Sequence, residues 1–117
     1  MHVEQETYPL AGEGEEVMVV FRDRPLTDVP PYLHVTALTG PVEFEVRSGY
    51  GPVTDDYAVN STVSLSQVNM AEIVSLPASA DPEQIVTVIR VLTGQVALAV
   101  HSPLPFRMEF RSRRYRP

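Results

Sequence analysis

Three kinds of side chain in this sequence have the chemistry to form a site: histidines, paired carboxylates and a cluster of arginines. A metal site of two histidines and a carboxylate needs its ligands close together. The three histidines, His2, His34 and His101, are widely separated and form no recognisable ligand set. The chain has no cysteine, which excludes thiolate nucleophiles, disulfides and cysteine-ligated metals. We therefore predict no bound metal and no cofactor.

Two carboxylate pairs are candidates for catalytic or calcium-binding groups. In a strand, Glu43 and Glu45 would lie about 6.6 Å apart on one face, a spacing compatible with two-carboxylate hydrolysis. However, Arg47 offsets their charge on the same face, and nothing nearby removes water from them. Asp55 and Asp56 are adjacent in extended chain and point to opposite sides, so we expect a solvated loop. With no Gly-x-Ser-x-Gly motif and no phosphate-binding glycine loop, the chain is predicted to be no enzyme.

Acidic and basic residues gather at opposite ends of the chain. Residues 1–16 carry five Glu and no Arg, and residues 107–117 carry five of the nine Arg with a single Glu. Opposite charges at two ends favour orientation and partner choice in an assembly. The candidate partner-binding residues are therefore the charged residues of these two ends: Glu4, Glu6, Glu13, Glu15, Glu16, Arg107, Arg111, Arg113, Arg114 and Arg116.

Alternation of apolar and polar residues predicts the elements that carry these groups. In residues 41–48, Val42, Phe44 and Val46 alternate with charged residues, which is typical of a half-buried strand. Eleven prolines lie mostly between the apolar segments and argue against long helices. Residues 66–75 can form a strand or a short helix capped by Ser66, and we favour the strand. Further strands are predicted at 17–22, 32–38, 85–92, 95–101 and 106–111, with a weaker one at 57–65.

These elements predict one all-β domain, an antiparallel β-sandwich or jelly-roll-like fold of about eight strands. Its parts are an acidic N-terminal arm (1–16), a sandwich core (17–106) and an Arg-rich C-terminal strand or tail (107–117). Within the core, residues 38–48 (L-T-G-P-V-x-F-x-V-x-S) recur as residues 92–102 (L-T-G-Q-V-x-L-x-V-x-S). Each copy is predicted to be a β-hairpin turning on Thr-Gly, with the glycine at positive φ. The alternative is that any hairpin rich in Val, Thr and Gly resembles another.

The outward residues of the second copy are Ala97, Ala99 and His101, in place of charged ones. Apolar residues on both faces indicate a strand covered on both sides, by the chain itself or by a neighbouring subunit. The segment 91–96 (V-L-T-G-Q-V) with the alternation after it resembles the glycine-turn strand pair of the cupins. That resemblance implies a β-barrel and a metal held by a His-x-His motif, a downstream carboxylate and a further histidine, and this sequence lacks the His-x-His motif. A cupin-type enzyme is therefore the third of our functional hypotheses.

The last predicted strand presents Phe106, Met108 and Phe110 on one face and arginines on the other, and arginine binds carboxylates and phosphates alike. A short basic segment on a chain of net charge −6 is weak evidence for binding of nucleic acid, so we rank nucleic acid second to protein as the partner. The alternative reading is a solubilising edge strand. A carbohydrate-binding module using Tyr32, Tyr50 and Tyr57 is the second functional hypothesis.

The first hypothesis is a non-enzymatic structural subunit that binds copies of itself or a larger lattice such as a capsid. The absence of cysteines and of a catalytic set, together with two oppositely charged ends, is what we expect of a small virion protein, such as a capsid decoration or minor coat protein of a tailed bacteriophage. The acidic start of the sequence is unlike a signal peptide. The sequence contains no stretch of 18 consecutive apolar residues, so we predict no membrane span. We therefore expect a homo-oligomer in the host cytoplasm or in the virion, without a membrane partner.

Overall fold

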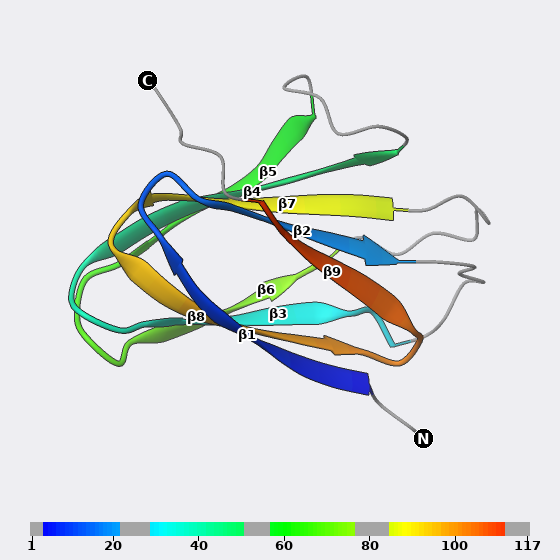
Figure 1. Cartoon of the computed structure of the whole chain (residues 1–117), viewed down its shortest axis with the longest axis horizontal. Coiled ribbons are helices and arrows are strands. Elements are labelled where there is room, and N and C mark those ends of the chain that lie inside the picture. Colours follow the sequence, from blue (N-terminus) through cyan, green and yellow to red (C-terminus); the bar gives the residue numbers. More distant parts are fainter. Residues whose placement is uncertain (1–3, 22–28, 51–56, 77–84, 112–117) are drawn as a thin grey trace.

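The computed structural model describes residues 4–21, 29–50, 57–76 and 85–111 of the chain. Within these residues the chain forms nine strands and no helix, arranged in two antiparallel sheets (Figure 1). The predicted all-β sandwich is thereby confirmed. The strands are β1 (Glu4–Gly12), β2 (Glu16–Phe21), β3 (Tyr32–Ala37), β4 (Val42–Tyr50), β5 (Ala58–Leu65), β6 (Ala71–Ser75), β7 (Ile85–Thr93), β8 (Gln95–Ser102) and β9 (Phe106–Arg111).

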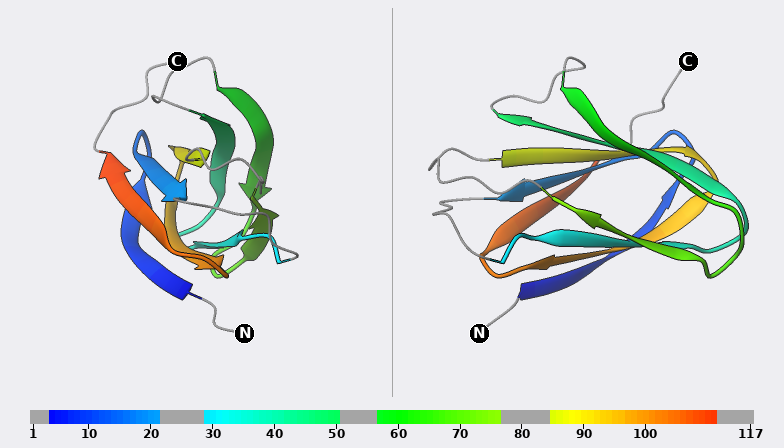
Figure 2. Two further views of the ribbon diagram at one scale, coloured as in Figure 1. Left: turned by 90° about the vertical axis from the view of Figure 1, so that its right-hand side faces the viewer. Right: turned by 180° about the vertical axis from the view of Figure 1, so that it is seen from behind.

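The two sheets form two layers that lie face to face (Figure 2). One sheet has the order β1-β8-β3-β6, and the other has the order β5-β4-β7-β2-β9. The pairing of the first eight strands is nested: β1 pairs with β8, β2 with β7, β3 with β6 and β4 with β5. This is the pattern of one long hairpin rolled over itself. The strand β9 is added beside β2, so it and β1 are outer strands of different sheets.

Alternation within the strands builds the core between the sheets. In β4, the inward Val42, Phe44 and Val46 are buried, whereas Glu43 is exposed on the outer face. Burial of each such side chain contributes about 1.5–3 kcal/mol. The predicted half-buried strand is therefore confirmed. The largest buried apolar side chains of this core are Phe21, Phe44, Leu33, Leu65, Ile85, Ile89 and Leu98.

The strands β2 and β7 are apolar on both faces. Their inward residues join the core, and outward Met18, Val20, Val86 and Val88 form a second buried cluster, against which Tyr57 packs. Apolar and polar residues do not alternate in β2 (E-V-M-V-V-F) or in the first part of β7 (I-V-T-V-I-R). This pattern reflects burial on both faces, because both strands lie inside the sheet rather than at its edges. The middle of this sheet's outer face is therefore apolar, and charged residues lie around it.

The two copies of the internal repeat do not form the predicted hairpins. Gly40 and Gly94 have positive φ, as predicted, at 148° and 85°. However, β3 and β8 lie in one sheet and β4 and β7 in the other, so each copy crosses between the sheets. The flanking strands pair with those of the other copy, and the amide of Leu38 donates to the carbonyl of Gln95 at 3.1 Å. Each turn is therefore a corner of the sandwich, and the two corners are adjacent (left side of Figure 1).

The acidic segment at the start of the chain is largely a strand of the sandwich. Residues 4–12 form β1, which pairs with β8 and has a register irregularity between Tyr8 and Ala11. Inward Tyr8 and Ala11 contact the core, which explains why the segment joins the sheet. In the ambiguous segment 66–75, residues 71–75 form β6, and the strand prediction is confirmed there. Residues 66–70 form a turn, in which Asn69 has a φ of 65°.

Candidate functional site

The strands of the two chain ends meet at one side of the sandwich. Here β1 and β9 are the outer strands of their sheets (left view of Figure 2). The Tyr8 hydroxyl donates a hydrogen bond to the backbone carbonyl of Met108, and the rings of Tyr8 and Phe110 stack with centroids 6.4 Å apart. The first and last strands are thus joined within one molecule, and together they present a continuous edge. We call this surface, residues 4–8 and 106–111, the chain-end edge.

The chain-end edge brings part of the predicted charged set together. Glu6 on β1 and Arg111 on β9 are exposed, and Arg107 forms an exposed ion pair with Glu109, with Nη2 and Oε1 3.2 Å apart. Glu4 is half-buried at the start of β1. Acidic groups on β1 therefore lie along the same edge as basic groups on β9. The predicted Arg113, Arg114 and Arg116 lie outside the described residues, as do His2, Asp55 and Asp56.

The other predicted acids lie at the turn between β1 and β2. Glu13 is exposed there, whereas one oxygen of Glu15, Oε2, is buried and has no hydrogen-bond partner within the described part of the chain. The turn is fixed to β7, because the amide of Gly14 donates to the carbonyl of Val91 and the amide of Val91 donates to the carbonyl of Glu15. Of these two side chains, only Glu13 is exposed to solvent and accessible to a binding partner.

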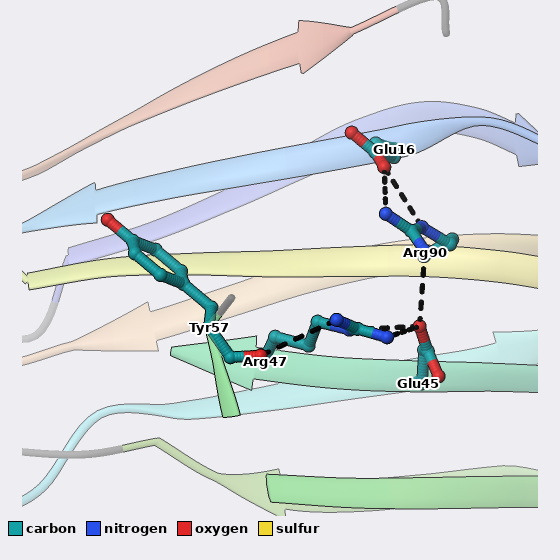
Figure 3. Close-up of polar contacts among 5 residues, drawn as sticks. All are labelled: Glu16, Glu45, Arg47, Tyr57 and Arg90. Carbon is teal, nitrogen blue, oxygen red and sulfur yellow. Dashed lines mark hydrogen bonds and ion pairs between the residues drawn. The ribbon is translucent and has the colours of Figure 1, made fainter. Parts of the chain in front are cut away.

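Glu16 has a structural role that the sequence did not reveal. It is 2% exposed and opposes Arg90 of β7, which in turn opposes Glu45 of β4. The Arg90 Nη2 and Nε atoms lie 2.7 and 2.9 Å from Glu16 Oε1, and Arg90 Nη1 lies 3.5 Å from Glu45 Oε1. Arg47 lies 3.0 Å from the same Glu45 oxygen (Figure 3). We call these four residues the charge ladder.

The charge ladder contains two carboxylates and two guanidinium groups, which balance one another across three strands. Burial of such groups is costly unless they are paired, and Glu16 is paired on one oxygen only. Its Oε2 is buried without a hydrogen-bond partner among the described residues. The ladder therefore holds β2, β7 and β4 in register beside the second apolar cluster. Glu45 is committed to the ladder, so the pair with exposed Glu43 is not an isolated carboxylate pair.

Burial raises the pKa of the Tyr8 phenol above its ordinary value of 10, and the charges of Glu6 and Glu109 raise it further. Burial also raises the pKa of Tyr57. The unfolded chain therefore releases these protons at lower pH than the folded chain does. The contribution of the two tyrosines to the free energy of unfolding is fully present below about pH 10 and is lost as the pH rises through their folded-state pKa.

We expect Tyr8→Phe to lower the free energy of unfolding by about 1 kcal/mol at pH 8, because the bond to the Met108 carbonyl is lost. We also expect the variant to lose less stability than the wild type as the pH rises above about 10, since one proton-release site is gone. Urea unfolding across this pH range measures both effects. Tyr50→Phe, at a tyrosine that is 48% exposed, is the control. An equal alkaline loss in wild type and Tyr8→Phe would contradict the assignment.

The outer face of the four-stranded sheet has a different character. Its central residues include Ala97, Ala99 and Thr36, which are half-buried, and the rings of Tyr32 and His101 stack there with centroids 4.6 Å apart. The strand registers place no Asp, Glu or Arg on this face. Its outward residues include Gln5, Thr7, Tyr32, His34, Thr36, Ala71, Ile73, Ser75, Gln95, Ala97, Ala99 and His101.

The tyrosines of the carbohydrate hypothesis are not gathered into one site. Tyr32 lies on the outer face of the four-stranded sheet, whereas Tyr50 ends β4 and Tyr57 packs on the outer face of the other sheet. His34 and His101 lie on neighbouring strands, with His34 opposite Ala99. No group of three or more His, Cys, Asp or Glu side chains within the described residues is placed to hold a metal ion. Over the same residues, no helix has the length and apolar character needed to cross a membrane.

Comparison with known proteins finds no matching family model, no matching curated protein and no matching solved structure.

Proposed function

We propose that this chain is a non-enzymatic structural subunit that binds neighbouring protein subunits through its chain-end edge. The observation that carries the proposal is the placement of acidic β1 beside basic β9 on one edge. Two copies related by a two-fold axis can set β1 of each against β9 of the other. The exposed Glu6 would then face arginines of the neighbouring copy, and such complementarity favours one orientation over others.

We further propose that the assembly is a virion, with this chain as a capsid decoration or minor coat protein of a tailed bacteriophage. The nested strand pairing supports the finer description of the sandwich as a jelly roll, a fold common in capsid proteins. Lectins and cupins use the same fold, so it supports the virion proposal without selecting it. Genes for packaging or coat proteins beside this gene would strengthen this part of the proposal, and a neighbourhood of sugar-metabolism genes would oppose it.

We expect the wild-type protein to form oligomers at about 0.01 M salt that lose their chain-end contacts and become smaller towards 1 M salt. Over this range the Debye length falls from about 30 Å to about 3 Å, which screens contacts between exposed charges. Neutralisation of the two exposed arginines of β9, Arg107→Gln with Arg111→Gln, lowers the net charge by two and should weaken low-salt association at least tenfold, a loss of about 1.4 kcal/mol. Light scattering across salt and protein concentration measures the association.

The matched control adds negative charge on the opposite side of the sandwich. Ser66→Glu with Gln67→Glu also lowers the net charge by two and changes two exposed residues of the turn that follows β5, the outer strand farthest from β9 in the same sheet. This control should leave the low-salt oligomers intact. Equal loss in both double variants would mean that net charge alone governs association. A wild-type protein that stays monomeric at every salt concentration would refute binding between copies through the chain-end edge.

A further inference from the structure

The opposite side of the sandwich carries an edge strand with unusual exposed side chains. The strand β6 is last in the four-stranded sheet, farthest from β1. Ile73 of β6 is 62% exposed, and Val68 and Met70 in the turn before it are 52% and 41% exposed. An exposed aliphatic edge strand is a template for pairing with another strand. The other outer strands of the two sheets are less suited, because β1 and β9 carry several charges and the exposed residues of β5 are mostly Ser and Thr.

The hydrogen bonds of β6 define which of its backbone groups are directed away from the sheet. The carbonyl of Met70 accepts from the amide of Ala37, and the amide of Leu76 donates to the carbonyl of Pro31. In an antiparallel pair, alternate residues direct both backbone groups to the same neighbour. The even-numbered residues of β6 therefore face β3. The backbone groups of Ala71, Ile73 and Ser75 are directed outwards, where none of the described strands pairs with them.

From this edge we infer that β6 pairs antiparallel with β6 of a second copy of the chain, around a two-fold axis at Ile73. This inference rests on the proposed assembly function and deepens it by naming the partner strand. Ala71 then opposes Ser75 of the second copy, and Ile73 opposes Ile73 of the second copy. In this register, the backbone groups of Ala71, Ile73 and Ser75 of each copy all form hydrogen bonds with the second copy. The two β-branched side chains of Ile73 meet on the axis.

Charge disfavours one of the two neighbouring registers, and the shift in the other direction leaves Ala71 without a partner in the second strand. The only charged residue of β6 is Glu72. In the register centred on Ile73, Glu72 opposes Val74 of the second copy. A shift that sets Ala71 against Ile73 would bring the two Glu72 side chains directly opposite each other, which is destabilising. The register with the most hydrogen bonds therefore also avoids this repulsion.

The pairing joins two four-stranded sheets into one sheet of eight strands. Ile73 opposes His34 on β3, so the uncharged outer face continues from one copy into the next. The strand has only five residues, and the contact is smaller than the about 800 Å² per partner of a standard interface. We expect a dimer that forms as the protein concentration rises and resists salt, because backbone hydrogen bonds and apolar contacts hold it. Since β6 and the chain-end edge lie on opposite sides, each subunit would have two contacts and could extend a lattice.

A charge-exchange experiment tests the two-fold contact at Ile73. Ile73→Glu and Ile73→Arg should each weaken dimerisation at least tenfold in sedimentation velocity at 0.5 M salt, because like charges then face each other. An equimolar mixture of the two variants should recover a mixed dimer, since Glu then faces Arg. Val59→Glu, at a residue of β5 that is 46% exposed, should dimerise like the wild type. Circular dichroism checks that each variant is folded.

Cross-linking provides a second readout, because the chain has no cysteine of its own. Residues that form a hydrogen-bonded antiparallel pair have Cα atoms about 5.5 Å apart, within the range that a disulfide spans. Ile73→Cys should therefore give disulfide-linked dimers under mild oxidation at protein concentrations where Val59→Cys does not. A wild-type protein that stays monomeric at 0.5 M salt up to millimolar concentration, or equal cross-linking of both variants, would overturn the inference.

The two proposals fail in different ways. A salt-resistant dimer that Ile73→Glu abolishes, without salt-sensitive oligomers, would retain the β6 contact and refute binding through the chain-end edge. Salt-sensitive oligomers that persist unchanged in Ile73→Glu, with no salt-resistant dimer in the wild type, would retain the chain-end contact and overturn the β6 pairing.

Discussion

Replacement of Arg90 by methionine is expected to lower the free energy of unfolding by about 3–5 kcal/mol, the usual cost of removing one partner from a buried ion pair. Arg90 holds Glu16, which is 2% exposed, with two nitrogen atoms within 3 Å of one carboxylate oxygen. Without the guanidinium group, the carboxylate stays buried beside the second apolar cluster and loses the one ion-pair partner that it has among the described residues. A loss of this size is a large share of the about 5–15 kcal/mol that stabilises an ordinary domain.

Two further variants separate the buried charge from other effects of the substitution. Replacing both partners, Glu16→Met with Arg90→Met, should recover at least about 2 kcal/mol relative to Arg90→Met, because no unpaired charge is left. Arg107→Met breaks the exposed pair with Glu109, and we expect it to cost less than about 1 kcal/mol. Urea unfolding at pH 7 measures all three. If Arg90→Met were no more destabilising than Arg107→Met, the charge ladder would have no structural role.

Gly94→Ala is the second substitution with a large expected effect, about 3 kcal/mol or more. Gly94 has a φ of 85°, which costs an L-residue about 1–3 kcal/mol. A Cβ atom there would also lie 2.5 Å from the backbone oxygen of Pro41 and 2.8 Å from Cγ2 of Val42. Both atoms belong to the other corner of the sandwich, so the two corners would have to move apart, with a further cost of about 1–3 kcal/mol.

The other copy of the repeat provides the control for this substitution. Gly40 also has a positive φ, at 148°, but a Cβ atom there would meet nothing within 4 Å. Gly40→Ala should therefore show the conformational cost alone and be the milder of the two variants in thermal or urea unfolding. Equal losses would mean that the contact between the corners contributes nothing. A native-like midpoint for Gly94→Ala would mean that the corners tolerate separation.

The candidate site was predictable only in part, and the reason lies in the distance along the chain between its partners. Clustering of charge at the two ends was visible in the sequence, and the structure brings β1 and β9 together at one edge. The burial of Glu16 was not predictable, because its partner is 74 residues away and belongs to a strand that reads as purely apolar around it. The exposure of Ile73 was equally hidden, since an isoleucine in a strand is more often in a core.

The sequence by itself determined the class of fold, most strand positions and the inward side of β4. These follow from local rules, because side chains alternate along a strand and proline and glycine interrupt it. Only the tertiary structure decided which strands pair, that the Thr-Gly turns cross between sheets, and that residues 4–12 form a strand. The pairing of β1 with β8 joins residues nearly a hundred positions apart, such as Glu4 and Ser102. Alternation specifies a strand's inward face but carries no information about its neighbour, and the packing of all nine strands together supplies that choice.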